Sequence, residues 1–372
     1  MDKETGLISL PIQYEGEIAY DILIGQGFEA LSGELKKEKY HLNNRKACIV
    51  SDRNVAPLYG EALAGAVEAK KVYQYAFLPG EEHKNLDALS GLFGFLIEKG
   101  FDRTDLILAL GGGVVGDMAG FAASCYLRGI DFIQVPTTLL AECDSSIGGK
   151  TAVDFQGYKN MVGAFYMPKL VYMNMDTLAS LEERQFLSGL AETLKHGLIK
   201  DADYFNWLLV HRTEILVKDP KILSKMIFRS CQIKKEVVEK DPKEKGERAL
   251  LNFGHTIGHA IEKDSDFSLL HGECVAIGCV AACFLSWKKG LLSEEDYQKV
   301  KQGFASFGLP VAGKIENAEH MLSLTKSDKK MQSGKIKFIL LSKIGAAFID
   351  REVSDQEILE AIQAVSRRGK YE

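Results

Sequence analysis

Histidines and a carboxylate recur at spacings that suit a metal ion. His255 and His259 stand four residues apart, which places both imidazoles on one face of a helix, and His271 follows a loop. Glu192 and Lys195 are three apart and share a face in the same way. Two histidines and one carboxylate with an open position form a usual catalytic zinc set, in which the metal polarises an oxygen. Spacing alone favours His255 and His259 as the ligand pair; histidines satisfied in the core or at the surface are the alternative.

Positively charged residues stand among glycines and small polar residues elsewhere in the chain. Lys150 follows two glycines, and Lys159 precedes Asn160. A lysine ammonium is a compact charge that suits a phosphate, although each lysine alone is more often a solvated surface residue. Arg248 lies seven residues before His255 and is predicted to reach the same site if one helix joins them. Its guanidinium can bind a carboxylate or phosphate with two hydrogen bonds.

A glycine-rich turn is predicted between a strand and a helix. The apolar run 106–110 leads into the glycines of 111–117, and 118–126 has a helical pattern. Glycines let the backbone approach a pyrophosphate, and the N-H groups of a helix N-terminus favour the anion. The spacing G-x-G-x-x-G is weak evidence alone, and a tight turn without a ligand is the alternative. The acidic partner for the ribose is predicted to be Asp52, after the strand 47–51, because Asp131 begins a strand.

The elements that must position these residues change character along the chain. Short β-rich runs alternate with helical segments up to about residue 175, at 19–24, 47–51, 71–78, 106–110, 131–135 and 170–173. This alternation predicts an α/β domain at 1–177 with a Rossmann-like, mostly parallel sheet. Long helical patterns then follow, at 181–199, 220–239, 250–262 and 272–288, with a small hairpin at 335–349. They predict a mainly helical, metal- and substrate-binding domain at 178–372.

Composition and charge exclude several classes of function. The formal charge of -5 and the lack of a dense Lys/Arg block argue against nucleic acid as the main partner. The longest apolar run, 274–285, is shorter than the roughly 20 residues of a membrane span. The seven cysteines include no Cys-x-x-Cys pair, so neither disulfides nor a cysteine zinc site is expected, and Cys274, Cys279 and Cys283 are predicted to be core residues. We therefore expect a cytoplasmic protein.

Seven motifs in order along nearly the whole chain resemble the 3-dehydroquinate synthase family. They are Pro79-Gly80-Glu81 with Lys84, the turn 111–117, Gln134 to Leu140, Asp144 to Thr151, Ala191-Glu192 with Lys195, Arg248 to Thr256, and His271 to Gly278. The chain departs mildly from the family pattern at Thr193, Leu194, His196, Pro242 and Cys274. None of these departures removes a chemical group that the family reaction requires.

The resemblance implies a role for each matching residue. It implies that Glu192, His255 and His271 bind the metal, in place of the His255 and His259 pair that spacing favours, and that His259 contacts the substrate. It implies NAD contacts from Asp52, Asn54, Glu81, Lys84, Gly112, Gly113, Val114, Asp117, Thr137, Thr138, Asp144, Lys150 and Lys159. Catalytic roles fall to Lys150, Lys195, Lys234, Arg248, Asn252, His259 and Lys330. Further substrate contacts fall to Arg128, from either subunit of a homodimer, and to Asp144, Lys159, Asn160 and Lys329.

The implied activity converts 3-deoxy-D-arabino-heptulosonate 7-phosphate, a sugar phosphate, to 3-dehydroquinate and phosphate. NAD takes and returns a hydride, a zinc or cobalt ion grips the substrate oxygens, and the eliminated phosphate needs nearby cations. Three alternatives stay open: a sister sugar-phosphate cyclase, a glycerol-dehydrogenase-like oxidoreductase, and a regulatory module that binds metal and NAD. The first would share the fold, NAD and metal, whereas the second has no need for Lys150, Lys159 and Arg248 around a phosphate.

Overall fold

A computed structural model describes residues 6–37, 40, 42–265, 268–327, 331–332 and 335–367. The chain divides into two compact units, Met1–Leu181 (unit 1) and Glu182–Glu372 (unit 2), which are described separately below. The sequence prediction placed this boundary after residue 177.

In its described part, unit 1 contains a seven-stranded sheet in the order β1-β2-β9-β6-β5-β3-β4. Its pairs are parallel except for β1 with β2, which is antiparallel. The six strands predicted from sequence are confirmed; β1 at the edge was not predicted. The strands are β1 (Ile8–Tyr14), β2 (Glu17–Gly25), β3 (Lys46–Asp52), β4 (Lys71–Phe77), β5 (Leu106–Gly111), β6 (Asp131–Pro136) and β9 (Leu170–Asn174).

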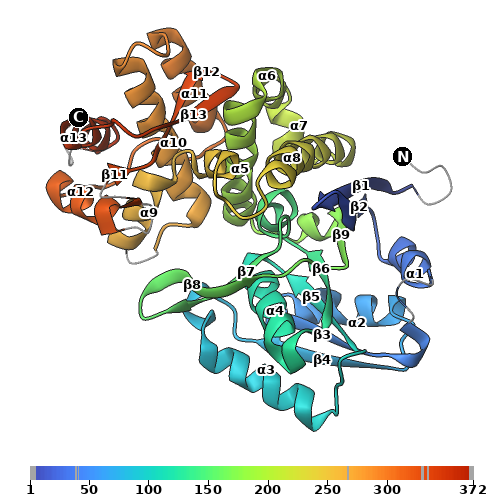
Figure 1. Ribbon diagram of the computed structural model, residues 1–372. Coiled ribbons are helices and arrows are strands. Elements are labelled where there is room, and N and C mark those ends of the chain that lie inside the picture. Colours follow the sequence, from blue (N-terminus) through green and yellow to red (C-terminus); the bar gives the residue numbers. More distant parts are fainter. Residues whose placement is uncertain are drawn as a thin grey trace. The chain divides into compact units, whose positions relative to one another are not determined.

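Helices cover both faces of this sheet (Figure 1). Successive strand residues point to opposite faces, so Ile107 packs with one core cluster and Leu108 with the other. The Leu108 cluster includes residues of α1 (Glu29–Leu35) and α2 (Ala56–Ala66), and the Ile107 cluster includes α3 (Leu86–Glu98) and α4 (Gly113–Cys125). Burial on both faces explains why strands such as β5 are apolar at every position.

Three neighbouring parallel strands end beside one another. The carboxyl ends of β3, β5 and β6 lie at Asp52, Gly111 and Pro136, and these strands are adjacent in the order β6-β5-β3. Open α/β sheets bind ligands at this edge. The residues that follow these three ends are therefore brought to one side of unit 1.

A separate hairpin of unit 1 was not predicted as strand. It consists of β7 (Lys150–Phe155) and β8 (Tyr158–Phe165), which pair antiparallel and pack against α4. Short 3-10 or π-helical segments complete the unit at Leu42–Asn44, Glu81–His83, Tyr126–Arg128, Ala141–Ser145 and Met175–Ala179. The hairpin begins with Lys150 and carries Lys159, so the predicted phosphate lysines lie on strands.

Unit 2 is mainly helical, as predicted, and α10 lies at its centre. Most of α10 (His271–Lys288) is buried, and it packs against α5, α9, α11, α13 and β12. The other helices are α5 (Glu183–Lys200), α6 (Ala202–Val210), α7 (Arg212–Leu216), α8 (Pro220–Lys240), α9 (His255–Asp264), α11 (Glu294–Ser306), α12 (Ala318–Ser327) and α13 (Asp355–Ala364). Two small hairpins pair β10 (Met331–Gln332) with β11 (Lys335–Ile336) and β12 (Phe338–Lys343) with β13 (Ala346–Asp350).

The predicted continuous helix 250–262 is wrong. A 3-10 segment, η6 (Glu247–Asn252), ends before Gly254, whose φ of 80° is left-handed, and α9 begins only at His255. A glycine adopts this conformation without the steric cost of a Cβ. Arg248 and His255 therefore lie on different elements, which removes the helical-register argument that joined them.

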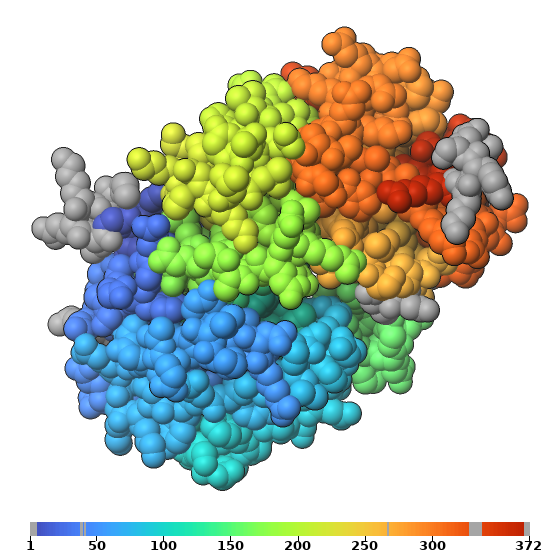
Figure 2. All heavy atoms as spheres, turned by 180° about the vertical axis from the view of Figure 1, so that it is seen from behind, coloured from blue at the N-terminus to red at the C-terminus, as the bar shows by residue number. Residues whose placement is uncertain are grey.

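Helices α6 and α11 of unit 2 contact each other. Gly303 of α11 packs against Phe205 and Leu209 of α6. The space-filling view of Figure 2 shows the yellow-green and orange parts of this unit next to each other. In the described residues, no helix is long and apolar enough to cross a membrane.

Candidate active site

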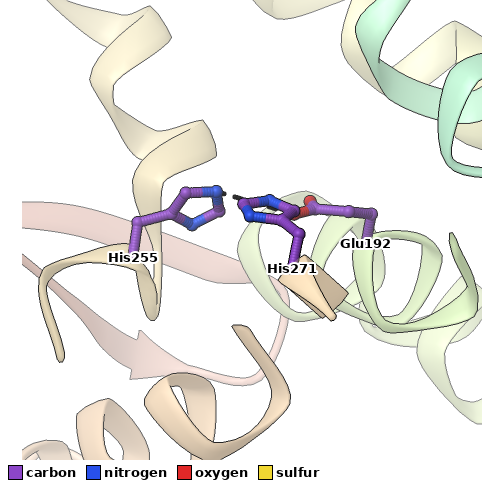
Figure 3. A group of neighbouring side chains, drawn as sticks. All are labelled: Glu192, His255 and His271. Atoms are coloured by element: carbon purple, nitrogen blue, oxygen red, sulfur yellow. Dashed lines mark ion pairs between the residues drawn. The ribbon is translucent and has the colours of Figure 1, made fainter. Parts of the chain in front are cut away.

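Three side chains of unit 2 converge from three different helices. Glu192 lies in α5, His255 is the first residue of α9, and His271 is the first residue of α10. The Nε2 atoms of His255 and His271 lie 3.5 and 3.3 Å from Oε1 of Glu192. Figure 3 shows the two rings and the carboxylate turned toward one another. One ligand atom from each residue falls within 4.8 Å of the others, a group of the size that one metal ion needs.

The carboxylate at the centre of this trio is fully buried among positive or ionisable groups. Glu192 is 0% exposed and forms an ion pair with Lys195, which is 1% exposed. The Lys195 ammonium also donates to the Leu251 carbonyl at 2.5 Å. Burial lowers the pKa of His271, but Glu192 and Glu262 outweigh it and raise that pKa to about 9. The site therefore attracts positive charge, as a cation site must.

His255 is oriented by the backbone. Its Nδ1 lies 3.1 Å from the Phe253 carbonyl, which can only accept a hydrogen bond, so Nδ1 carries a proton, and Nε2 faces Glu192 at 3.5 Å. His259 falls into a second group, with Glu262 and His271, and not into the trio. The structure thus brings together the set that the family resemblance implies, rather than the His255 and His259 pair that spacing favours.

The crossing of α9 and α10 brings the histidines close. A Cβ on Gly278 would lie 1.9 Å from the Gly254 carbonyl oxygen and 2.9 Å from the Gly258 nitrogen. A Cβ on Gly272 would lie 1.9 Å from the Ser188 carbonyl oxygen in α5. These glycines let the three helices approach closely enough that the His255 and His271 rings are 5.3 Å apart.

Other predicted substrate residues of unit 2 are buried or held in place. Arg248 is 2% exposed and donates through Nη1 to the Pro242 carbonyl at 2.5 Å. Asn252 donates to Glu244 at 2.6 Å, and Lys234 of α8 is 5% exposed. The unusual His196 is also buried and lies 2.7 Å from the Ser230 hydroxyl. Lys329 and Lys330 lie outside the described residues.

Several predicted NAD contacts of unit 1 meet around Lys84. Its ammonium lies 2.7 Å from the Asp117 carboxylate and 3.6 Å from Glu81, and it donates to the Asn160 side-chain oxygen at 2.6 Å. Lys159 pairs with Glu81 at 3.7 Å. Burial lowers the pKa of Lys84, but Asp117 and Glu81 outweigh it, so this pKa is raised. The segment before α3, the start of α4 and the β7–β8 hairpin thus share one network.

The glycine turn packs against two other motifs. α4 begins at Gly113, as the strand-turn-helix pattern predicted. A Cβ on Gly112 would lie 3.1 Å from Cγ2 of Thr138, and one on Gly113 would lie 2.9 Å from the Ser145 hydroxyl. Thr137 donates its backbone N-H to the Gly111 carbonyl at 3.0 Å. Val114 follows in the first turn of α4, whose N-H groups can bind an anion.

The remaining predicted residues of unit 1 lie on nearby turns and strand ends. Asp52 ends β3, and its carboxylate accepts the backbone N-H groups of Asn54 and Val55 at 2.8 and 3.0 Å. Asp144 lies in the π-helical segment, and Lys150 begins β7. Arg128 is exposed in a turn where it and Leu127 both have positive φ, 68° and 50°.

Sequence reasoning missed Glu262 and Glu244. Glu262 stands seven residues after His255 and three after His259, a spacing that places all three on one face of α9 and could have revealed it. Glu244 carries no such signal, because it reaches Asn252 from a loop. The three predicted core cysteines, 274, 279 and 283, are buried, and burial raises the pKa of the Cys279 thiol.

Comparison with known proteins identifies the family. Residues 74–188 match the family model described as 3-dehydroquinate synthase N-terminal, and residues 189–331 match 3-dehydroquinate synthase C-terminal. The 3-dehydroquinate synthase of Ruminiclostridium cellulolyticum is 42% identical over 93% of this chain and 96% of its own length. The one from Thermodesulfovibrio yellowstonii is 44% identical over 93% of this chain and 97% of its own length.

Solved structures of similar fold include other cyclases. The 2-epi-5-epi-valiolone synthase from Streptomyces hygroscopicus, with NAD+ and Zn2+ bound, has a TM-score of 0.86 at 28% identity and covers 96% of this chain and 99% of its own. A 2-deoxy-scyllo-inosose synthase with carbaglucose-6-phosphate, NAD+ and Co2+ gives 0.86 at 27%, over 96% and 100%. The glycerol dehydrogenase of Schizosaccharomyces pombe, at 16% identity and a TM-score of 0.63, shares the fold. On these matches, the chain belongs to the 3-dehydroquinate synthase family.

Proposed function

We propose that this chain is a 3-dehydroquinate synthase, which converts 3-deoxy-D-arabino-heptulosonate 7-phosphate to 3-dehydroquinate and phosphate with NAD and a zinc or cobalt ion. The observation that carries the proposal is the buried trio of Glu192, His255 and His271, in a chain more than 40% identical to 3-dehydroquinate synthases over most of its length. Related cyclases were solved with NAD+ and with Zn2+ or Co2+.

The trio fits a divalent ion by its chemistry. A carboxylate and two imidazole Nε2 atoms face one another, which is the donor set of a catalytic zinc site with an open position. His259 lies beside this set, with its ring centroid 5.1 Å from that of His255. We assign Glu192, His255 and His271 as metal ligands and His259 as a proton-transfer residue on the substrate.

The glycine turn fits a dinucleotide. Gly112 and Gly113 are packed where a Cβ would meet Thr138 and Ser145, and α4 begins there with its N-H groups directed outward from the turn. We assign this turn to the pyrophosphate and Asp52 to the ribose, because Asp52 ends the adjacent parallel strand β3. Lys84, Asp117 and Glu81 would position the groups around them rather than react.

The bound groups supply hydride transfer and polarisation of substrate oxygens, and the chain supplies binding and proton transfer. Cations must surround a departing phosphate, and we assign Lys150, Lys159 and Arg128 to it. Lys195, Lys234, Arg248 and Asn252 are assigned to the substrate's carboxylate and hydroxyl groups, with Asp144 and Asn160. Burial of Lys195, Lys234 and Arg248 keeps these charges oriented and shielded from water.

The alternatives are less well supported. The valiolone and inosose synthases are only 27–28% identical to this chain, against 42–44% for two 3-dehydroquinate synthases. The likeness to glycerol dehydrogenase extends to the fold alone, at 16% identity. A regulatory module has no need of so many buried charges. We further infer that the enzyme is cytoplasmic and that it forms a homodimer. Sedimentation at micromolar concentration would test the homodimer.

The reaction itself is the first test. The purified protein is incubated with the heptulosonate phosphate, a divalent metal and a trace of NAD, and released phosphate and NADH absorbance are followed. A 3-dehydroquinate synthase releases many phosphates per NAD and accumulates no NADH, because NAD is regenerated. NADH formed in proportion to product would support a dehydrogenase instead, and turnover of heptulose 7-phosphate rather than the heptulosonate would support a sister cyclase.

The ligand assignment has its own test. We expect Glu192→Gln and His271→Ala to lose the bound metal and nearly all activity, because each removes one of three protein ligands. His259→Ala should keep the metal while kcat falls by about 10²-fold or more, the usual effect of losing a proton-transfer group. Metal content by atomic emission, measured with kcat on the same samples, checks both. Full metal occupancy in the first two variants would show the assignment to be wrong.

A further inference from the structure

The two histidines of the trio differ in what lies on their Nδ1 side. Both present Nε2 to the Glu192 carboxylate. Nδ1 of His255 faces a neutral backbone carbonyl, that of Phe253, at 3.1 Å. Nδ1 of His271 instead faces a second carboxylate, Oε1 of Glu262, at 3.7 Å. The His271 ring therefore lies between two carboxylates, one at each nitrogen.

Glu262 is a buried charge whose position is set by its helix. It is 3% exposed, and it lies on the same face of α9 as His255 and His259, seven and three residues away. Burying a carboxylate costs several kcal/mol unless a charge or hydrogen bond offsets the loss of water. The His259 and His271 ring nitrogens and the Glu262 carboxylate lie within 4.8 Å of one another. The buried negative charge is thus directed at the first residue of α10.

We propose that Glu262 is a positioning residue for the metal site: its carboxylate accepts the Nδ1-H of His271, which leaves the Nε2 lone pair of that ring for the metal. This inference rests on the proposed function, in which His271 is a ligand. A ligating histidine almost always donates its other ring N-H to a carboxylate, carbonyl or water, and that partner fixes the tautomer and raises the basicity of the ligand. The 3.7 Å separation needs only a small side-chain rotation to close to hydrogen-bond length.

The same residues allow one other arrangement. His259, Glu262 and His271 are themselves a group that could hold a cation. A neutral imidazole has one lone pair, however, and His271 directs Nε2 to Glu192 and Nδ1 to Glu262, so it can serve only one of the two sites. The burial of Glu192 and its position between two Nε2 atoms favour the trio, and Glu262 is left as the acceptor.

The test compares three variants with the wild-type protein. Glu262→Ala removes the acceptor, and Glu262→Gln keeps an oxygen that can accept but removes the charge. Asp264→Asn is the matched control, because Asp264 is on the same helix and its carboxylate faces another histidine, His320, at 3.6 Å, outside the trio. Zn2+ affinity is measured by competition with a chelator, and the visible spectrum of the Co2+-loaded protein reports the ligand geometry.

We expect the Zn2+ dissociation constant to rise by about 10- to 100-fold in Glu262→Ala, the usual effect of losing such a partner, with an altered Co2+ spectrum. Glu262→Gln should lie between it and the wild type. Asp264→Asn should match the wild type in both measurements. Thermal unfolding with excess Zn2+ confirms that each variant is folded, and the Gln variant serves if the Ala variant is not.

The outcomes separate this inference from the proposed function. If Glu192→Gln loses the metal while Glu262→Ala and Glu262→Gln bind Zn2+ as tightly as the wild type, the ligand set stands and the role of Glu262 is wrong. If Glu192→Gln keeps the metal and the Glu262 variants lose it, the cation is held by His259, Glu262 and His271, and both proposals fall. A wild-type protein that binds no Zn2+ would overturn the metal site itself.

Discussion

Each unit has a network built around a buried charge, Lys84 in unit 1 and Glu192 in unit 2, and the two charges have opposite signs. In unit 1 the cation Lys84 is surrounded by Asp117, Glu81 and the Asn160 side chain, which come from loops, a helix start and a hairpin. In unit 2 the anion Glu192 is surrounded by Lys195, His255 and His271, all on helices. The lysine is satisfied by groups within the protein, whereas the trio places two imidazole Nε2 atoms around a carboxylate, which is a donor set that a divalent cation can bind. The comparison teaches that one network fixes structure and the other is arranged to take up a ligand.

Breaking the lysine network should give the largest change in stability. Lys84→Met keeps most of the side-chain volume but leaves Asp117 without this cation, while Glu81 keeps its pair with Lys159. Removing one partner of a buried pair typically costs 3–5 kcal/mol, and we expect about 3 kcal/mol here, since Asp117 retains some contact with water. Amide hydrogen exchange in α4 measures the loss. NAD affinity should fall in the same variant.

Lys169→Met is the control for this change. Lys169 is also in unit 1 and pairs with Asp131 at 3.5 Å, but its side chain is 55% exposed. Exposed pairs contribute little, so its exchange rates should stay near those of the wild type. Equal losses of stability in Lys84→Met and Lys169→Met would show that burial does not make the Lys84 ion pairs more stabilising than the exposed Lys169 pair.

Disturbing the helix crossing should have the next largest effect, and it should act on the metal rather than on NAD. In Gly278→Ala the new Cβ would lie 1.9 Å from the Gly254 carbonyl oxygen, so α9 and α10 must separate. Overpacking of this kind costs about 2 kcal/mol. The shift also moves His255 relative to His271, and Zn2+ affinity should fall. Chemical denaturation and chelator competition measure the two effects.

The matched variant is Gly94→Ala in α3, where a Cβ would meet nothing within 4 Å. It should be neutral or slightly stabilising, because alanine restricts the unfolded chain. Unchanged Zn2+ affinity in Gly278→Ala would mean that the crossing does not set the distance between the histidines.

The smallest expected effect on stability comes from Glu357, a partly exposed carboxylate of unit 2, and it depends on pH. The pKa of Glu357 is lowered to about 2 by hydrogen bonds from the Ser354 backbone N-H, the Lys289 ammonium and the Ser354 hydroxyl. Burial raises this pKa, but the hydrogen bonds outweigh it. A lowered pKa means that the ionised form stabilises the fold above the ordinary pKa near 4.5, and that this contribution is lost as pH falls toward 2. The side chain is about one third exposed, so we expect about 1 kcal/mol at pH 7.

Glu357→Gln tests this pH dependence. The difference in unfolding free energy between the variant and the wild type should be constant above about pH 5 and shrink between about pH 4.5 and 2. Glu360→Gln, an exposed position on the same helix, should show no such difference. A difference that grows as the pH falls would contradict the sign.

The sequence predicts the parts of this fold that depend on local pattern. The parallel strands are visible because burial on both faces makes them apolar throughout, as in β5. The β7–β8 hairpin is not, because large apolar residues such as Tyr158, Met161 and Phe165 are exposed in β8, so its sequence shows no apolar–polar alternation. The break before His255 depends on the left-handed Gly254, and a helical pattern on both sides conceals it. Periodicity cannot reveal such a conformation.

The candidate site shows the same limit. Spacing indicates His255 and His259 because they share one helix. Glu192 and His271 come from other helices, so only the family resemblance implied that they join His255. The role of Glu262 depends on a contact between α9 and α10 that no single-helix pattern contains. The NAD contacts stay a prediction; the sheet brings together those that follow the ends of β3, β5 and β6, because these parallel strands end at one edge.

The short segment 251–253 has one more consequence. Two of its carbonyls contact side chains of the candidate site: that of Leu251 accepts a hydrogen bond from Lys195, and that of Phe253 lies against Nδ1 of His255. Because both carbonyls belong to one short segment, a displacement of that segment would move the partners of the ammonium and of the imidazole together. The spacing between the Lys195 ammonium and His255, which we propose as a metal ligand, therefore depends on the placement of residues 251–253.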